Sequence, residues 1–383
     1  NSILEMLRKV PLVTVDGEEN IKVNGSSNFK VYVNGRPNNM MSNNPKDVLK
    51  SMPASSIRKI EVITNPGPKY DAEGVGGILN IVTVGKGLEG YTATFNGWAA
   101  KFSYGGSVYS TIKKDKLTMS ARYNYNYSPL PESHNDGDRI FTGDPSTPSA
   151  SNATSRATSK TYENFHSGNF EASYDIDTLR LVTASIGISN SHNSTHSTNV
   201  LNATSPLDGS QLYAYKQMGR SKENTFFLNG SFDYQRLFHV KERMLTFSYR
   251  ISTSPYSIND TDDYKDREAA DDWTDFISLA RNQFTDVHSR STEHTFQIDY
   301  TTPIGKAHTI ETGVKYILRD NRANSDRYLQ KTDATDYLFD DDNSMHYRHR
   351  NDILAAYTGY GLKLGKFSGR AGLRYEHTKQ DVK

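Results

Sequence analysis

Apolar and polar residues alternate one by one over long stretches of this chain. In the clearest stretch, Leu117 to Tyr127, leucine, methionine, alanine and three tyrosines occupy odd positions, and threonine, serine, arginine and asparagine occupy even ones. Side chains of a β-strand point alternately to its two faces, so this period predicts a strand with one apolar and one polar face. Its length, about ten residues, suits a tilted strand that crosses a bilayer.

The alternation recurs at residues 225–234, 245–252, 296–300, 310–319 and 370–376. Short connections occur at residues 114–116, 175–177, 239–242, 305–306 and 365–366, and long ones, rich in Asp, Asn, Ser and Thr, at residues 129–160, 194–210, 255–289 and 320–344. Short turns at one end and long loops at the other are typical of outer-membrane β-barrels. A soluble antiparallel sandwich also alternates, but we expect it to have shorter strands, no such asymmetry and a denser apolar core.

Before residue 85 the pattern differs and predicts a small α/β domain. Ser2 and Glu5 form a capping box for a helix that ends at Pro11, and a second helix is expected at residues 45–52. Short strands are expected at residues 12–15, 21–23, 29–33 and 60–63, with Asp-Gly and Asn-Gly turns among them. We therefore divide the chain into residues 1–85, a small domain, and residues 86–383, an antiparallel sheet that makes the protein mainly β.

Composition supports a fold with a wet interior. Only 35% of the residues are hydrophobic, yet the chain has 24 Tyr and 16 Phe, which argues against disorder. A large barrel satisfies both facts, because its lumen is polar and its apolar face meets lipid. The formal net charge is +1 and there is no cysteine, so we expect no nucleic-acid partner, no disulfide and no thiol chemistry. No secretory signal is visible, and no apolar run is long enough for a transmembrane helix.

Several residue clusters were weighed for chemistry. Gly74, Gly76 and Gly77 lack the strand–loop–helix context of a phosphate-binding loop, and we interpret them as letting the backbone pass closely under the barrel wall. His192 and His196 would lie about 13 Å apart on an extended chain, so surface polarity is the simpler interpretation. Acidic clusters lie in the expected loops, at Asp136 and Asp138, Asp262 and Asp263, and Asp340 to Asp342, without a complete calcium motif. No catalytic arrangement, metal site or cofactor site follows from these spacings, so an enzyme is not expected.

One stretch resembles a known family. The run from Ile57 to Ile63, then Pro66, Tyr70 and the Gly76-Gly77-Ile78-Leu79-Asn80-Ile81-Val82-Thr83 ending, is similar to the end of the plug domain of TonB-dependent outer-membrane receptors. Residues 7–15 and 31–35 match the same plug in the same order. The motif residues are Glu61, Pro66, Gly76, Gly77 and Asn80. Thr64-Asn65-Pro66 stands where the family often has Arg-Gly-Pro, so a latching arginine is absent at that position.

The resemblance implies a plug inside an antiparallel transmembrane barrel of twenty-two strands, of which about eleven are visible here. It also implies location in the cell outer membrane, and import of a scarce solute such as a siderophore, cobalamin, glycan or peptide. Energy would come from the TonB complex in the periplasm, whose binding segment precedes the plug in the family and is not seen here. A surface lipoprotein is a further expected partner, besides the lipid. We expect the gene to encode a similar length again downstream. The alternative is an adhesion or structural barrel that binds partners through its long loops.

The resemblance and the chain path also suggest a cargo site. Tight turns between the first strands would place residues 16–20 and 34–44 on one side of the plug, which faces the exterior in similar receptors. Candidate ligand-binding residues there are Glu18, Asn20, Arg36, Asn38, Asn39, Met40 and Met41. A fixed cation and amides suit carboxylates, phosphates or sugar hydroxyls, and the methionines add an adaptable apolar surface. A polar connecting loop without a special role is the equally weighted alternative.

Overall fold

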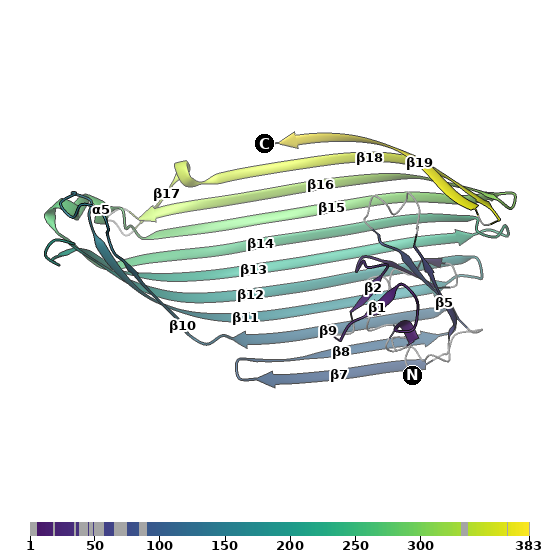
Figure 1. Ribbon diagram of the computed structural model, residues 1–383, viewed down its shortest axis with the longest axis horizontal. Helices are drawn as coiled ribbons and strands as arrows, with labels where there is room; N and C mark the ends of the chain where they lie inside the picture. The colour runs from purple at the N-terminus through teal and green to yellow at the C-terminus, as the bar shows by residue number, and fades with distance from the viewer. Residues whose placement is uncertain are drawn as a thin grey trace.

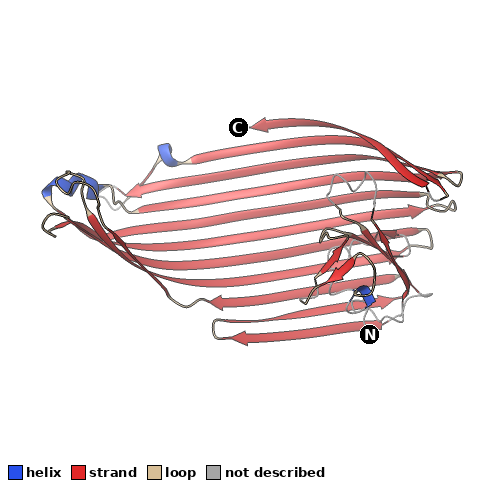
Figure 2. Cartoon of the chain, viewed as in Figure 1, coloured by secondary structure: helices blue, strands red, loops and turns tan. Residues whose placement is uncertain are grey.

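The computed structural model describes residues 6–17, 20–33, 36–37, 45, 49, 57–64, 75–83, 90–330, 336–365 and 367–382. Almost all of them belong to β-strands, with only short helical turns between (Figure 2). One antiparallel sheet of thirteen strands forms most of the molecule, and two small sheets lie in front of it (Figure 1). The chain is therefore mainly β, as its alternation predicts.

Eleven strands follow one another along the large sheet, each antiparallel to the next. They are β7 (Gly90–Ala100), β8 (Ser103–Lys114), β9 (Leu117–Pro129), β11 (Asn152–Asp175), β12 (Arg180–Thr204), β13 (Gln211–Leu237), β14 (Met244–Ala269), β15 (Gln283–Ile304), β16 (His308–Gln330), β18 (Met345–Leu364) and β19 (Phe367–Val382). Two short strands, β10 (Ser133–Arg139) and β17 (Tyr337–Phe339), pair with β11 and β16. The expected count of about eleven strands is confirmed. Within the described residues β7 and β19 do not pair with each other, so the sheet is open.

Short turns join the strands at one end of the sheet (Figure 1). At the other end residues 101–102 join β7 to β8 and residues 205–210 join β12 to β13, and the remaining connections are longer. The turn between β11 and β12 shows how a short turn is held. Asp177 accepts hydrogen bonds from the backbone N–H groups of Leu179 and Arg180 at 2.9 and 2.8 Å and pairs with the Arg180 guanidinium. The guanidinium and these N–H groups lower the pKa of Asp177 to about 2. The long connections carry β10, β17 and the short helix α5 (Thr274–Ser278).

The two faces of the large sheet differ in the way the alternation predicts. On β15 the outward Phe296 and Ile298 are 41% and 50% exposed, whereas the inward Gln297 and Asp299 are 8% and 5% exposed. The apolar side chains are exposed and the polar ones are buried, which is the reverse of the arrangement in a water-soluble protein. It is what a barrel requires when lipid lies outside and a polar, occupied lumen lies inside.

The outward apolar residues form a band about ten residues tall, here called the apolar band. On β16 it runs from Ile310 to Leu318. A tyrosine–histidine hydrogen bond lies near each border of the band. Near the short turns, His308 Nδ1 and the Tyr360 hydroxyl are 2.5 Å apart. Near the other border, His294 Nδ1 and the Tyr249 hydroxyl are 2.9 Å apart. Ten residues per strand match a tilted bilayer crossing. Because β13 has 27 residues and β18 has 20, the strands continue well past the band on the long-loop side.

The small sheets form the start of the chain. A two-stranded sheet contains β1 (Val13–Val15) and β2 (Ile21–Val23). A four-stranded sheet has the order β4 (Arg36–Pro37), β3 (Lys30–Val33), β6 (Ile78–Thr83) and β5 (Ile57–Ile63), with β3 parallel to β6. Their common core consists of buried apolar residues: Leu7, Val13, Ile21, Val23, Phe29, Val31, Leu49, Ile57, Leu79 and Ile81.

The sequence locates most of these strands to within a few residues. The strand expected at residues 60–63 begins earlier, at Ile57, because the register with β6 extends its pairing to Thr83. Met6 and Leu7 are helical, as are Pro45 and Leu49, and the rest of both expected helices lies outside the described residues. The domain boundary at residue 85 stays a prediction, since residues 84–89 also lie outside them. No helix in the described part of the chain is long and apolar enough to cross a membrane.

A charge placed on the apolar band tests this assignment of faces. Leu228 lies on the outward face of β13 between Phe226 and Phe232, and the neighbouring Asn229 lies on the inward face. Leu228→Arg should destabilise the assembled barrel by about 2–4 kcal/mol, as a cation near the bilayer midplane does. Asn229→Arg is the matched control and should cost far less. Unfolding from lipid vesicles by urea measures both, and equal losses would show that the faces are assigned wrongly.

Candidate functional site

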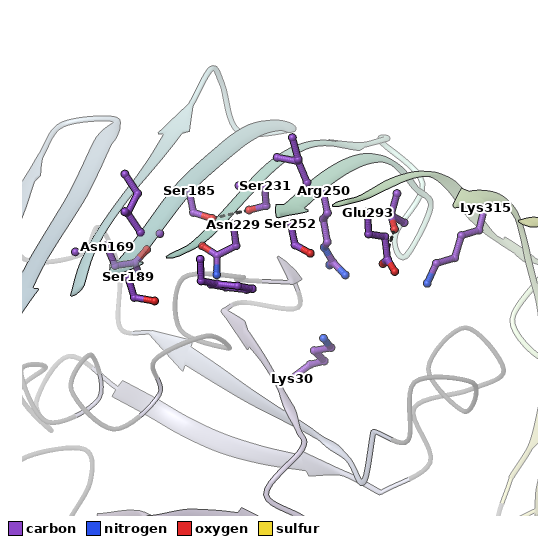
Figure 3. A pocket seen from close by; sticks show the side chains of 17 residues that line it. Lys30, Asn169, Ser185, Ser189, Asn229, Ser231, Arg250, Ser252, Glu293 and Lys315 are labelled. Atoms are coloured by element: carbon purple, nitrogen blue, oxygen red, sulfur yellow. Dashed lines mark hydrogen bonds between the residues drawn. The ribbon is translucent and has the colours of Figure 1, made fainter. Parts of the chain in front are cut away.

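A cavity of about 650 Å³ lies between the small domain and the large sheet (Figure 3). From the small domain it is lined by Lys30 of β3, and from the sheet by residues of β11, β12, β13, β14, β15 and β16. Its size is that of a small-molecule site. Seventeen residues line it: Lys30, Gly168, Asn169, Ser185, Gly187, Ile188, Ser189, Phe227, Asn229, Gly230, Ser231, Arg250, Ile251, Ser252, Glu293, Thr295 and Lys315.

The polar lining follows from strand alternation and register. Ser231 of β13 is the register partner of Ser185 on β12 and of Arg250 on β14, and Arg250 is that of Thr295 on β15. Directly paired residues share one face of a sheet, so one row of inward positions supplies hydroxyl and guanidinium groups side by side. The Ser185 and Ser231 hydroxyls are 2.7 Å apart and hydrogen-bonded (Figure 3). Asn169, Ser189, Asn229 and Ser252 add further amides and hydroxyls.

Cations outnumber anions in this lining. Lys30 extends from the small domain toward the sheet, and Arg250 extends from the sheet toward Lys30 (Figure 3). Lys315 is the third cation. Glu293 is the single acidic group in the lining, and Arg319 binds it through two hydrogen bonds of 2.9 and 2.5 Å. The guanidinium of Arg250 makes no hydrogen bond or ion pair with any described residue. It can therefore donate two parallel hydrogen bonds to a carboxylate or phosphate in bidentate geometry.

Phe227 is an aromatic residue on the inward face, 38% exposed and part of the cavity lining. The alternation alone assigns this position to a polar residue and therefore does not reveal Phe227 as part of the site. A signal was present, because Phe226-Phe227-Leu228 places three apolar residues in succession and so interrupts the period of two. Its ring offers an apolar surface beside otherwise polar groups.

The candidate ligand residues of the small domain are only partly described. Glu18, Asn38, Asn39, Met40 and Met41 lie outside the described residues, and for Arg36 only the backbone is described, paired with Val33. Asn20 closes its turn by donating from its backbone N–H and side-chain amide to Asp16, at 2.8 and 2.9 Å. Asn20, the one member of this set whose side chain is described, does not line the cavity. The set stays a prediction.

The motif residues Glu61 of β5 and Asn80 of β6 are in contact. Asn80, which is 7% exposed, donates a hydrogen bond of 2.8 Å to Glu61 across the β5–β6 pair. Lys59 forms an ion pair with the same carboxylate. The hydrogen bond from Lys59 and then that from Asn80 lower the pKa of Glu61. Pro66 lies outside the described residues.

Gly76 and Gly77 allow another part of the chain to pack closely against them. The expectation that this part is the barrel wall was wrong. A Cβ on Gly76 would lie 2.2 Å from Ser26 Cβ, and one on Gly77 would lie 3.1 Å from the Ile63 oxygen and from Val23 Cγ1. These nearest atoms belong to the small domain, not to the barrel wall. The turn after β2 packs there, with the Gly76 N–H donating to the Asn28 oxygen at 2.8 Å.

The other candidate clusters are occupied by ordinary contacts. His192 is hydrogen-bonded to Asn224 at 2.6 Å, and it lies four residues from His196 along the extended strand β12. Asp136 and Asp138 face Arg156 at 3.7 and 3.2 Å. Asp262 accepts from Gln217 and Gln283 at 3.0 and 2.8 Å. In the part of the chain that the structure describes, no three metal-ligating groups converge.

Two family matches cover more than half of the sequence. Residues 1–78 match the family described as TonB-dependent Receptor Plug Domain, and residues 236–383 match the Outer membrane protein beta-barrel family. Both families are those of receptors or membrane barrels rather than of enzymes. No curated protein matches the chain.

Solved structures similar to this chain include three receptors or transporters. The ferric yersiniabactin uptake receptor FyuA from Yersinia pestis is 12% identical, with 99% of this chain and 70% of that chain covered and a TM-score of 0.25. The ferric citrate transporter FecA is also 12% identical, covering 98% and 67%, with a TM-score of 0.26. The ferric preacinetobactin receptor BauA from Acinetobacter baumannii is 9% identical, covering 97% and 71%, with a TM-score of 0.23. TM-scores this low establish no shared fold.

The Glu61 contacts predict a pH dependence of the β5–β6 pair. Because the pKa of Glu61 is lowered in the folded state, its contribution to stability is present above the unfolded-state value of about 4.3 and is lost as the pH falls through the folded-state value. Amide hydrogen exchange of β5 and β6, corrected for intrinsic rates, should show protection falling below about pH 4.3. Glu61→Gln should remove this pH dependence. An unchanged profile in Glu61→Gln would contradict the assignment.

Proposed function

Because the chain belongs to the TonB-dependent receptors of the outer membrane, we propose that it imports a scarce anionic solute through the plugged barrel, with energy supplied by TonB. The cargo would be an acidic member of the expected classes: a siderophore, cobalamin-like cofactor, glycan or peptide that carries carboxylate or phosphate groups. The observation that carries the proposal is the cationic cavity between β3 and the barrel wall.

The chemistry of the cavity supports an anionic cargo. Lys30, Arg250 and Lys315 surround the space, and the charge of the single acidic lining residue, Glu293, is compensated by Arg319. Serine hydroxyls and asparagine amides suit the oxygen-rich groups that accompany such charges. Since a cavity bounded by two parts of the protein has a lower effective dielectric constant than water, attraction to these cations is strengthened there.

The position of the cavity supports transport rather than surface adhesion. It is bounded on one side by the small domain and on the other by the barrel wall, so a bound solute contacts both. Movement of the small domain would remove Lys30 from the cavity and weaken the binding. External work on the plug is thereby coupled to release, which is the role proposed for the TonB complex. A surface lipoprotein that delivers the cargo to this receptor is also proposed as a partner.

The plug-tip residues are proposed as an earlier contact for the same cargo. Glu18, Asn20, Arg36, Asn38, Asn39, Met40 and Met41 would meet the solute before it reaches the cavity. The mixed cation and amide chemistry of this set resembles that of the cavity lining, so one anionic cargo suits both. Replacing Arg36, Asn38 and Asn39 by alanine should then weaken cargo binding without changing barrel assembly.

Growth of a deletion strain tests the proposed function. The strain should fail on low concentrations of one anionic cargo from a panel of ferric citrate, acidic oligosaccharides and acidic peptides, and the full-length gene should restore growth. Arg250→Ala should weaken cargo binding about ten- to hundredfold, the range for losing a hydrogen bond to a charged group. Equilibrium binding of that cargo to the purified receptor gives the value.

Controls separate this proposal from its rivals. Lys306→Ala removes an exposed cation from the short turn between β15 and β16, outside the cavity, and should leave binding unchanged. Uptake should stop when TonB is deleted or the proton gradient is collapsed. A defect confined to adhesion, or to a neutral solute such as maltodextrin, would contradict the proposal.

A further inference from the structure

Three arginines lie side by side on the outward face of the sheet, beyond the apolar band. Arg290 on β15 is the register partner of Arg322 on β16, and Arg322 is that of Arg348 on β18. Directly paired residues of antiparallel strands have Cα atoms about 4.5–5.5 Å apart. Like charges placed directly opposite destabilise a sheet. This set, here called the arginine row, therefore requires an anion to offset its repulsion.

The protein supplies only part of that anion. Asp320 accepts from Arg322 Nη2 at 2.9 Å and from Arg348 Nε and Nη2, both at 3.2 Å. One carboxylate thus serves two guanidinium groups. The guanidinium of Arg290 is exposed and makes no hydrogen bond or ion pair with a described residue. Three positive charges and one negative charge leave an excess of two positive charges in the row.

The neighbouring charges lie beside the arginine row rather than within it. Arg350 pairs with Asp352 at 3.1 Å, His288 lies 3.1 Å from Asp286, and His346 lies 2.7 Å from Asp326. On β19, Lys379 and Asp381 contribute one charge of each sign, opposite Asp352 and Arg350 in the register. The two histidines carry charge only when protonated, so Asp286 and Asp326, four residues beyond the row on β15 and β16, add negative charge there, and the excess of two positive charges is confined to the arginine row itself.

The height of the row suits a lipid headgroup. The apolar band ends at Phe296, Leu318 and Leu354 on the three strands, and the arginines lie four to six residues beyond these ends. At about 3.4 Å per residue and a tilt of about 40°, this is roughly 10–15 Å of height. Arginine side chains reach back toward the interface by several ångströms. The headgroup layer extends about 5–8 Å beyond the hydrocarbon on each side, so the guanidinium groups can meet it.

We propose that the arginine row binds the phosphate group of an anionic amphiphile in the outer leaflet. A phosphate can accept two parallel hydrogen bonds from a guanidinium group. The N–H donors of the Arg290 guanidinium are not bound by any described residue. The acyl chains of the same molecule would lie against the apolar band directly below, on Phe296, Leu318 and Leu354. The site lies on the outer wall, away from the cavity, so it is independent of the proposed transport function.

Native mass spectrometry of the full-length receptor in neutral detergent tests the site. The probes are didecanoyl phosphatidic acid, didecanoyl phosphatidylcholine and inorganic phosphate. Phosphatidic acid should bind in preference to phosphatidylcholine. Arg290→Gln should weaken its binding about fivefold, the effect of one basic residue at an anionic surface. Asp320→Asn should strengthen it by about the same factor, because the internal competitor for the guanidinium groups is removed.

Arg156→Gln is the matched control. Arg156 is also exposed and paired with carboxylates, but it lies ten residues beyond His166 on β11, far from the apolar band. It should retain wild-type binding of phosphatidic acid. Equal losses in Arg290→Gln and Arg156→Gln, or weaker binding in Asp320→Asn, would overturn the site. Displacement of phosphatidic acid by an equal concentration of inorganic phosphate would show that a soluble anion, not a lipid, occupies it.

Discussion

The structure depends on one constraint, the pairing of every backbone N–H and C=O group of a segment that lies in lipid. Lipid offers these groups no alternative partner, so strands must pair edge to edge along their length. The continuous ladder from β7 to β19 meets this demand for all strands between its two edges. Once the ladder is set, side chains have only two directions available. Lipid then selects apolar residues on the outward face, and the lumen selects polar ones on the inward face.

The same register creates the chemistry on both faces. On the inward face it brings Ser185, Ser231 and Arg250 into one row, opposite Lys30 of the small domain. On the outward face it brings Arg290, Arg322 and Arg348 into another row above the apolar band. Both rows gather positive charge, but they meet different surroundings. One faces a cavity suited to a solute, and the other faces the border of the bilayer.

The sequence predicts the parts of this fold that depend on local pattern. Period two located the central parts of the strands and their faces, and the motif ending in Gly76-Gly77 and Asn80 indicated the plug. Much of the sequence assigned to long loops, at residues 152–160, 194–204, 255–269, 283–289 and 320–330, belongs instead to strands that extend past the apolar band. Local pattern could not show which residues meet across strands. Arg290 and Arg348 are 58 residues apart, and only the register of β16 brings them together. Lys30 and Arg250 line the same cavity because the small domain lies in front of the large sheet, which local sequence pattern does not show. Phe227 was missed because it breaks the alternation on which the assignment of faces relied.

The central claim is that one face of this sheet meets lipid and the other meets a polar lumen. Because the chain contains no cysteine, a single cysteine introduced at each position of β15 can carry a nitroxide spin label. Collision rates with oxygen and with a water-soluble nickel complex then report lipid and water at each site. The account predicts oxygen maxima at even positions from 294 to 304, nickel maxima at odd positions, and no oxygen maximum at residues 283–292. Water access to both faces along the whole strand would contradict it.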